Sequence, residues 1–85
     1  LLGIGYDISL VSRNRDGETR LTARASKEAT SQGLSLAKIM SSVAQQIGGE
    51  GGGHDGAAGW SGKVDRIAAE SSFISHVAKI SRGVE

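Results

Sequence analysis

The segment from Gly48 to Gly59 is the part of the sequence whose residue types suggest chemistry. It reads Gly-Gly-Glu-Gly-Gly-Gly-His-Asp-Gly-Ala-Ala-Gly, and eight of the 13 glycines of the chain lie between Gly48 and Gly62. A glycine in regular structure costs about 0.5–1 kcal/mol relative to alanine, so this concentration suggests a use. Without Cβ atoms, successive N–H groups can surround an anion, and His54 adds a ring donor. The segment therefore predicts a phosphate-binding loop.

Other interpretations of this segment fit less well. It is not a Walker loop, because no Gly-Lys-Ser/Thr follows, and not a Rossmann fingerprint, because a predicted helix precedes it. A flexible linker would be a Gly/Ser repeat, whereas this segment contains a histidine, two acids and an Ala-Ala pair. We therefore favour a binding loop over a linker.

The composition limits the kind of protein. The chain has 85 residues, a net charge of +1 and no cysteine. This length suits one small domain over residues 1–85, and the opening Leu1-Leu2 suggests a piece of a longer protein. The absence of cysteine excludes a disulfide framework and fits a cytoplasmic location. No stretch is apolar enough to span a membrane, and the low net charge predicts few contacts to nucleic acid, to one or two nucleotides.

Hydrophobic periodicity predicts the elements that position the glycine segment. Alternation over residues 4–11, with Ile4, Tyr6, Ile8 and Leu10 on one face, predicts a strand. Asp16-Gly17 predicts a hairpin turn, and residues 19–25 predict a second strand with a polar face. A helical stripe follows over residues 35–47, with Ser35 as N-cap and Gly48 as its end.

The remaining residues predict a third strand and a second helix. Ala57 to Lys63 is the expected strand, with Trp60 as its packing residue. From Asp65 onward, we expect a helix with its apolar stripe at Ile67, Ile74, Val77, Ala78 and Ile80. The predicted fold is therefore an α+β domain in the order β-β-α-loop-β-α, with two helices on one face of a small sheet of about three or more strands.

Few residues outside the glycine segment are candidates for a role. Arg24, on the polar face of the second strand, is suited to phosphate because its planar guanidinium can donate two parallel bonds. Trp60 and Phe73 are expected in the core, with base stacking as the alternative for Trp60. His76 is interpreted as a partly buried or surface histidine. Three further arginines are interpreted as hairpin residues that maintain solubility, with contact to nucleic acid as the alternative: Arg13, Arg15 and Arg20.

The glycine segment closely resembles a family signature, Gly-Gly-x-Gly-Gly-Gly-His-x-x-Ala-Ala-Gly, of the first DHH-associated domain. That domain is the C-terminal part of RecJ-like exonucleases, nanoRNases and cyclic-dinucleotide phosphodiesterases. The order of elements is similar over essentially the whole chain. The strand from Leu21 to Ser26 also resembles the family's Ser-x-Arg-Ser strand, with Thr22 at the first serine and Ala25 inserted before Ser26. Asp55 stands where the family often has proline.

The resemblance implies a binding role with named residues. Arg24 would be the cationic partner, and the phosphate or terminal nucleotide would be held by Gly51, Gly52, Gly53, His54 and Gly56. No residue of this chain is expected to be catalytic or to bind metal, because the family's manganese is held by an N-terminal DHH domain. The chain would not hydrolyse anything by itself. It would position single-stranded nucleic acid or a short oligonucleotide for a RecJ-like exonuclease or an oligonucleotide phosphodiesterase.

Two other functions stay open from the sequence. Alanyl-tRNA synthetases end in a related glycine-rich domain that binds tRNA, but His54 and the run Ala57-Ala58-Gly59 favour the phosphoesterase. The third possibility is a stand-alone interaction module whose glycine segment binds a free nucleotide or a phosphorylated protein.

Overall fold

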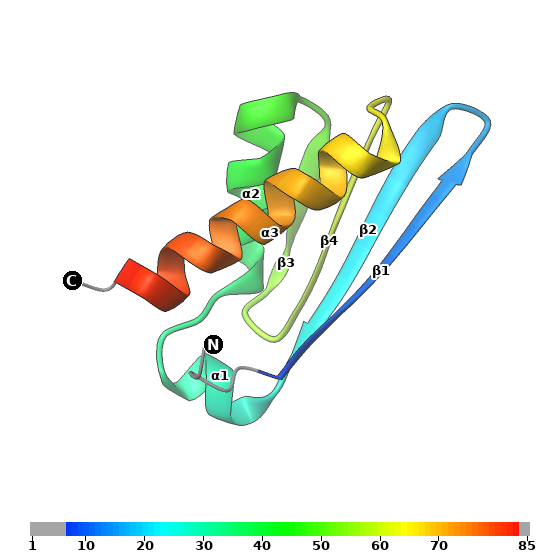
Figure 1. The fold of residues 1–85 in the computed structure, drawn as a ribbon. Coiled ribbons are helices and arrows are strands. Elements are labelled where there is room, and N and C mark those ends of the chain that lie inside the picture. The colour runs from blue at the N-terminus through cyan, green and yellow to red at the C-terminus, as the bar shows by residue number, and fades with distance from the viewer. Residues whose placement is uncertain (1–6, 84–85) are drawn as a thin grey trace.

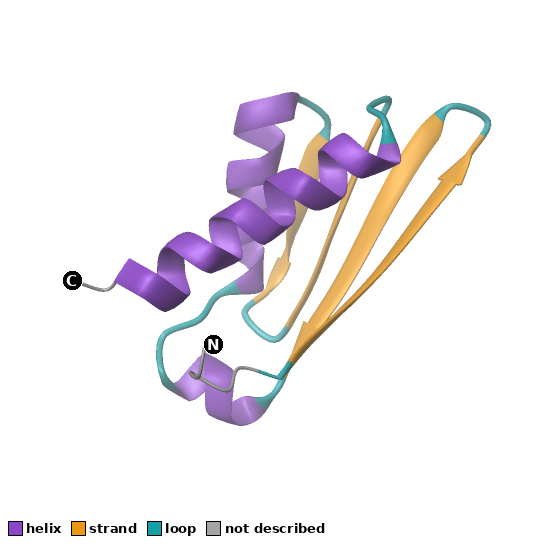
Figure 2. Cartoon of the chain, in the orientation of Figure 1, coloured by secondary structure: helices purple, strands orange, loops and turns teal. Residues whose placement is uncertain are grey.

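The computed structural model describes residues 7–83 as a four-stranded antiparallel sheet with two long helices on one face and a short helix at one end (Figures 1 and 2). The strand order in the sheet is β1-β2-β4-β3. The elements, in chain order, are β1 (Ile8–Arg15), β2 (Glu18–Ala25), α1 (Lys27–Ser31), α2 (Leu36–Ile47), β3 (Glu50–His54), β4 (Ala57–Gly62) and α3 (Arg66–Gly83). The α+β prediction is therefore confirmed, and the structure adds the strand β3 and the short helix α1.

The predicted hairpin between β1 and β2 is confirmed. Arg15 pairs with Glu18, so Asp16 and Gly17 form a two-residue turn. Both turn residues have positive φ, 54° and 81°, which matches the right-handed twist of the two strands. The first strand extends to Arg15, beyond the predicted end at residue 11, while Ile4 and Tyr6 lie outside the described residues.

Helix α2 matches its prediction. The Ser35 hydroxyl accepts a hydrogen bond from the Lys38 backbone N–H at 3.3 Å, and Gly48 ends the helix with a φ of 86°. The predicted stripe faces the core, where Leu36, Ile39, Met40 and Val43 are buried. Helix α1 was not predicted; the Ser26 hydroxyl caps it by accepting from the Ala29 N–H at 3.1 Å.

The prediction of a loop for the glycine segment is wrong over Glu50–His54. These residues form β3, paired antiparallel with β4 from Glu50 opposite Ser61 to His54 opposite Ala57. Helix α2 lies directly against this strand. A Cβ atom added to Gly51 would stand 2.3 Å from the carbonyl oxygen of Met40, a separation that no real side chain could adopt. The glycine at this position therefore lets the helix backbone approach the strand.

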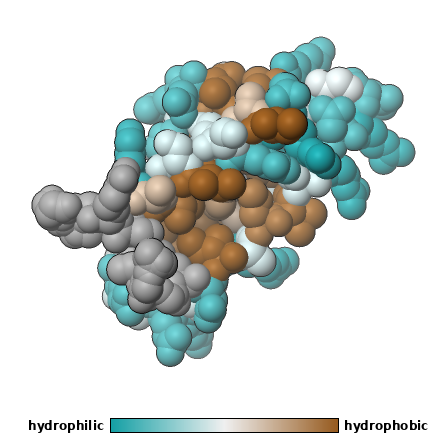
Figure 3. Space-filling model, viewed as in Figure 1, coloured by the Kyte–Doolittle hydropathy of each residue, from teal (hydrophilic) through white to brown (hydrophobic). Residues whose placement is uncertain are grey.

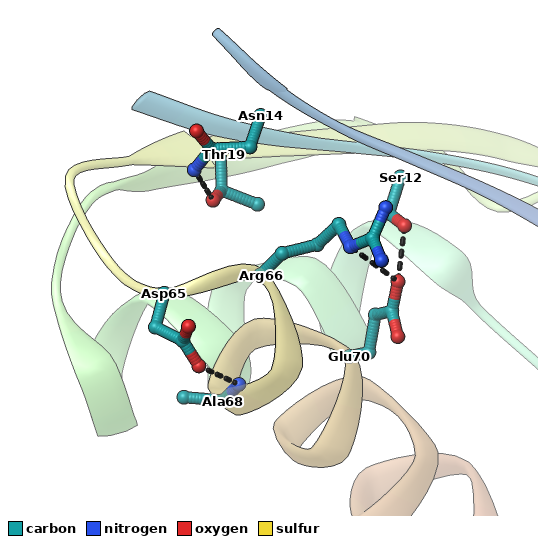
Figure 4. Close-up of polar contacts among 7 residues, drawn as sticks. All are labelled: Ser12, Asn14, Thr19, Asp65, Arg66, Ala68 and Glu70. Carbon is teal, nitrogen blue, oxygen red and sulfur yellow. Dashed lines mark hydrogen bonds and ion pairs between the residues drawn. The ribbon is translucent and has the colours of Figure 1, made fainter. Parts of the chain in front are cut away.

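The second helix begins where predicted, but its buried face differs. The Asp65 carboxylate accepts from the Ala68 N–H at 3.0 Å and so caps α3 (Figure 4). Ala69 and Phe73 are buried in the core, whereas Ile67 and Ile74 are 67% and 60% exposed. The predicted stripe is therefore wrong at Ile67, Ile74 and Ala78, whereas Val77 and Ile80 are partly buried against the core.

Polar contacts fasten α3 to the first strand. Glu70 accepts a hydrogen bond from the Ser12 hydroxyl and lies 3.7 Å from the Arg66 guanidinium (Figure 4). Within the hairpin, the Asn14 side chain donates a hydrogen bond to the Thr19 hydroxyl. In Figure 3, hydrophobic residues gather around α3, and hydrophilic residues cover the end of the β1–β2 hairpin. None of the helices between residues 7 and 83 combines the length and apolar character needed to span a bilayer.

Candidate functional site

The strand register places two predicted binding residues in one row on the face of the sheet opposite α2 and α3. Ala57 of β4 pairs with Arg24 of β2 on one side and with His54 of β3 on the other. Directly paired residues of antiparallel strands point to the same face, so the Arg24 and His54 side chains leave the sheet together. Two strand spacings separate their Cα atoms by about 10 Å. Both residues are exposed.

The adjacent row has almost no side chains. Thr22 pairs with Gly59, and Gly59 pairs with Gly52. A Cβ atom added to Gly52 would meet no atom within 4 Å, so this glycine opens onto free space. A shallow hollow of about 450 Å³ lies over this row, and its lining includes Arg20, Thr22, Glu50, Gly52, Gly59 and Ser61. We call this hollow the glycine trough.

The other glycines predicted to bind phosphate differ from Gly52. Gly51 also lines the trough, but its Cβ position is directed at α2, and Gly53 and Gly56 are not part of the lining. Added Cβ atoms at Gly51 and Gly53 would collide with the backbones of Met40 and Ala58, at 2.3 and 2.6 Å. Gly56 lies in the β3–β4 turn, where its carbonyl accepts from the Ala25 N–H at 2.9 Å. In a strand, successive N–H groups point in opposite directions, so β3 cannot form the predicted nest of amides. The predicted arrangement of successive amides around a phosphate is therefore wrong over Glu50–His54.

Asp55, the acid beside His54, has a structural partner. Its carboxylate accepts a hydrogen bond from the Ser35 hydroxyl at 2.7 Å, and its carbonyl accepts from the Leu36 N–H at 2.9 Å. These contacts join the β3–β4 turn to the start of α2. The acid is thereby directed to the helix N-terminus, where negative charge is favourable.

Trp60 and His76 lie outside the site. Trp60 is 2% exposed and donates from Nε1 to the Gly48 carbonyl at 2.8 Å, so base stacking by its ring is wrong and its core assignment is confirmed. Phe73, at 3% exposure, is likewise in the core. His76 is partly buried in α3, with Nδ1 2.8 Å from the Ser72 carbonyl oxygen.

The charges around the row leave Arg24 accessible. Arg24 lines a second hollow, of about 360 Å³, together with Asp7, Ser9 and Ser26. Among the side chains described, those of residues 7–80, an ion pair within 4 Å joins Arg66 and Glu70, and none involves Arg24 or His54. The same residues contain no group of three histidine, aspartate or glutamate side chains that could hold a metal ion.

Sequence reasoning missed the lining of the glycine trough. Thr22, Gly59 and Ser61 lie on the same face as Arg24, and Glu50 stands at the edge strand. Alternation along β2 could have indicated Thr22, which lies two residues from Arg24. The contribution of β3 could not be found in this way, because a run of glycines carries no alternating pattern.

Comparisons with known proteins agree with the resemblance seen in the glycine segment. A family model described as the DHHA1 domain matches residues 3–80. An uncharacterized protein of Methanocaldococcus jannaschii is 29% identical over 82 residues. The match covers 94% of this chain, and the chain spans 25% of that relative's length. The crystal structure of the C-Ala domain from Aquifex aeolicus alanyl-tRNA synthetase has the same fold, with a TM-score of 0.71 and 20% identity over 91% of this chain and 67% of that one. Because the family model spans nearly the whole sequence, this chain belongs to the DHHA1 family, the DHH-associated domain.

Proposed function

We propose that the outer face of the sheet holds the terminal phosphate and nucleotide of a single-stranded nucleic acid or short oligonucleotide. The observation that carries this proposal is the row in which Ala57 separates Arg24 from His54. A small residue between two cationic or donor side chains leaves space for an anion above it. The guanidinium can bind two phosphate oxygens at once, and the imidazole can donate a further hydrogen bond.

The glycine trough would take the rest of the terminal nucleotide. Its floor at Gly52 and Gly59 is backbone, so a planar base or a ribose could lie close to the sheet. Binding would therefore use side chains for the phosphate and shape for the nucleoside. This arrangement replaces the predicted nest of amides while keeping Arg24, Gly52 and His54 as binding residues.

Hydrolysis would take place in another domain. We propose that the parent protein is a DHH-family phosphoesterase, RecJ-like or acting on short oligonucleotides, whose N-terminal DHH domain holds manganese. The metal would activate the attacking water there. The contribution of this chain would be to position the scissile phosphate over that metal. The cysteine-free sequence fits the cytoplasm, the proposed compartment.

A second candidate is tRNA binding, as in an alanyl-tRNA synthetase. The likeness to the C-Ala domain supports this candidate at the level of fold. His54 and the run Ala57-Ala58-Gly59 favour the phosphoesterase, because the synthetase segment resembles Gly-Gly-Gly-Arg/Lys-Pro-Asp followed by Ala-Gln.

NMR titration of the 85-residue chain would test the proposal. We expect adenosine 3′,5′-bisphosphate and a 5′-phosphorylated dinucleotide to shift the signals of Gly52, His54 and Arg24. Arg24→Gln and His54→Gln should each weaken binding by about tenfold, since a hydrogen bond to a charged group contributes about 1.5–3 kcal/mol. Lys79→Gln, which removes an exposed cation from α3, is the matched control. Shifts confined to other regions would contradict the proposal, and tighter binding of tRNA than of either nucleotide would favour the second candidate.

A further inference from the structure

A second cluster of cations lies at the end of the β1–β2 hairpin. A hollow of about 360 Å³ there is lined by Arg13, Arg15, Asp16, Glu18, Arg20 and Lys63. Four of these side chains are basic and two are acidic, so the lining has a net charge of +2. This local excess is larger than the net charge of +1 for the whole chain. Positive charge is therefore concentrated in this region.

Two of these arginines face each other without a neutralising partner. Arg13 pairs directly with Arg20 across the hairpin, and like charges in this arrangement are destabilising. The acid Glu18 stands opposite Arg15 instead. Within the described part of the chain, no carboxylate lies within 4 Å of the Arg13 or Arg20 guanidinium. An anion placed between these two arginines would relieve their repulsion.

This cluster continues into the glycine trough. Arg20 lines both hollows, and the trough leads from Arg20 past Thr22 toward the row of Arg24 and His54. Arg24 follows Arg20 by four positions in β2, a distance of about 13 Å along the strand. The outer face therefore has cations at both ends of an open channel floored by backbone.

We propose that the hairpin cluster binds the backbone phosphates of the nucleotides that follow the terminal one. A single strand of nucleic acid would then lie along β2, with its end at Arg24 and His54 and its next phosphates at Arg20, Arg13 and Arg15. The inference rests on the proposed function and extends the contacts on the ligand from its terminal nucleotide to the nucleotides that follow. A nucleic acid fits better than an acidic peptide, because its charges are regularly spaced and its bases could occupy the uncharged floor of the trough.

Affinity as a function of ligand length tests this inference. The probes are thymidine 5′-monophosphate and a 5′-phosphorylated thymidine octamer, titrated into the 85-residue chain at several salt concentrations. We expect the octamer to bind at least about tenfold more tightly. Arg13→Gln combined with Arg15→Gln should remove that gain and leave the monophosphate affinity unchanged. The same variant should lower the salt slope by about 1.4, or 0.7 for each phosphate that no longer has a cationic partner.

The controls separate this inference from the proposed function. Lys38→Gln combined with Lys79→Gln removes the same charge from exposed positions on the two large helices and should leave octamer binding unchanged. An octamer that binds no better than the monophosphate would overturn the inference. So would an equal loss of affinity for both ligands in the hairpin variant, or an oligoglutamate that binds as tightly as the octamer. Failure of the proposed function would be distinct, because the monophosphate would then not shift His54 or Gly52. Circular dichroism of each variant checks that the fold is retained.

Discussion

The Ser35 hydroxyl donates a hydrogen bond to the Asp55 carboxylate, with 2.7 Å between Oγ and Oδ1. Ser35 also caps α2, so one side chain joins the helix N-terminus to the β3–β4 turn. We expect Asp55→Ala to lower the free energy of unfolding by about 1–2 kcal/mol, because a hydrogen bond to a charged group is removed. Urea denaturation followed by circular dichroism would measure this effect. A double-mutant cycle with Ser35→Ala should show coupling, and strictly additive effects would contradict the structural role of Asp55.

Gly51 and Gly52 are neighbours in β3 and should respond differently to the same substitution. Gly51→Ala would place a Cβ atom against the Met40 carbonyl, so we expect a loss of about 1–3 kcal/mol in unfolding free energy. Gly52→Ala meets open space and should change stability by no more than about 0.5 kcal/mol. Under the proposed function, however, Gly52→Ala should weaken nucleotide binding by narrowing the trough. Thermal unfolding of both variants would compare their stabilities, and NMR titration would compare their nucleotide affinities. Equal destabilisation by the two substitutions would contradict the described packing of Gly51 against α2.

Phe73 and Ile74 test which face of α3 is buried. The sequence predicted both residues in the core, but Phe73 is 3% exposed and Ile74 is 60% exposed. Phe73→Ala should cost about 3–5 kcal/mol, enough to unfold much of the population in a domain of this size. Ile74→Ala should change stability by less than about 0.5 kcal/mol. If denaturation showed the larger loss for Ile74→Ala, the orientation of α3 would be incorrect.

Trp60 should contribute to stability through both its volume and its indole N–H. Trp60→Phe leaves a cavity and removes the donor to the Gly48 carbonyl, so we expect a loss of about 2–3 kcal/mol. Val11→Ala is a suitable control, because Val11 is 60% exposed on the outer face. Far-ultraviolet circular dichroism during urea unfolding would compare the two variants. A stability near that of the unsubstituted chain for Trp60→Phe would show that the ring is not a core element.

Local signals explain which elements could be predicted. The Asp16-Gly17 turn and the caps of α2 depend on residues that are close in sequence, so the pattern alone indicated them. β3 could not be predicted in this way, since glycines have low strand propensity and the strand forms through pairing with β4. The buried face of α3 was predicted only in part: Phe73, Val77 and Ile80 contribute to it, whereas Ile67 and Ile74 do not.

The sequence named candidate residues for the site but did not indicate how they are arranged in space. Arg24, Gly52 and His54 follow from the family resemblance, whereas their neighbourhood depends on β4 lying between β2 and β3. That strand order joins segments about 30 residues apart, and no local pattern specifies it. Alternation along β3 places the Cβ positions of Gly51 and Gly53 against Met40 and Ala58, although both residues are adjacent in sequence to the proposed binding residue Gly52.

The alternation along β2 has a consequence for the timing of ligand capture. Leu21 and Ala23 are buried, while Arg20, Thr22 and Arg24 between and beside them are exposed. A slip of one residue in pairing would exchange the two sets, moving guanidinium groups into the interior and leucine into water. Formation of the hydrophobic interior and presentation of the arginines are thus a single event. Under the proposed function, every natively folded molecule would present these arginines to its ligand, so association should proceed in one kinetic phase without a preceding rearrangement.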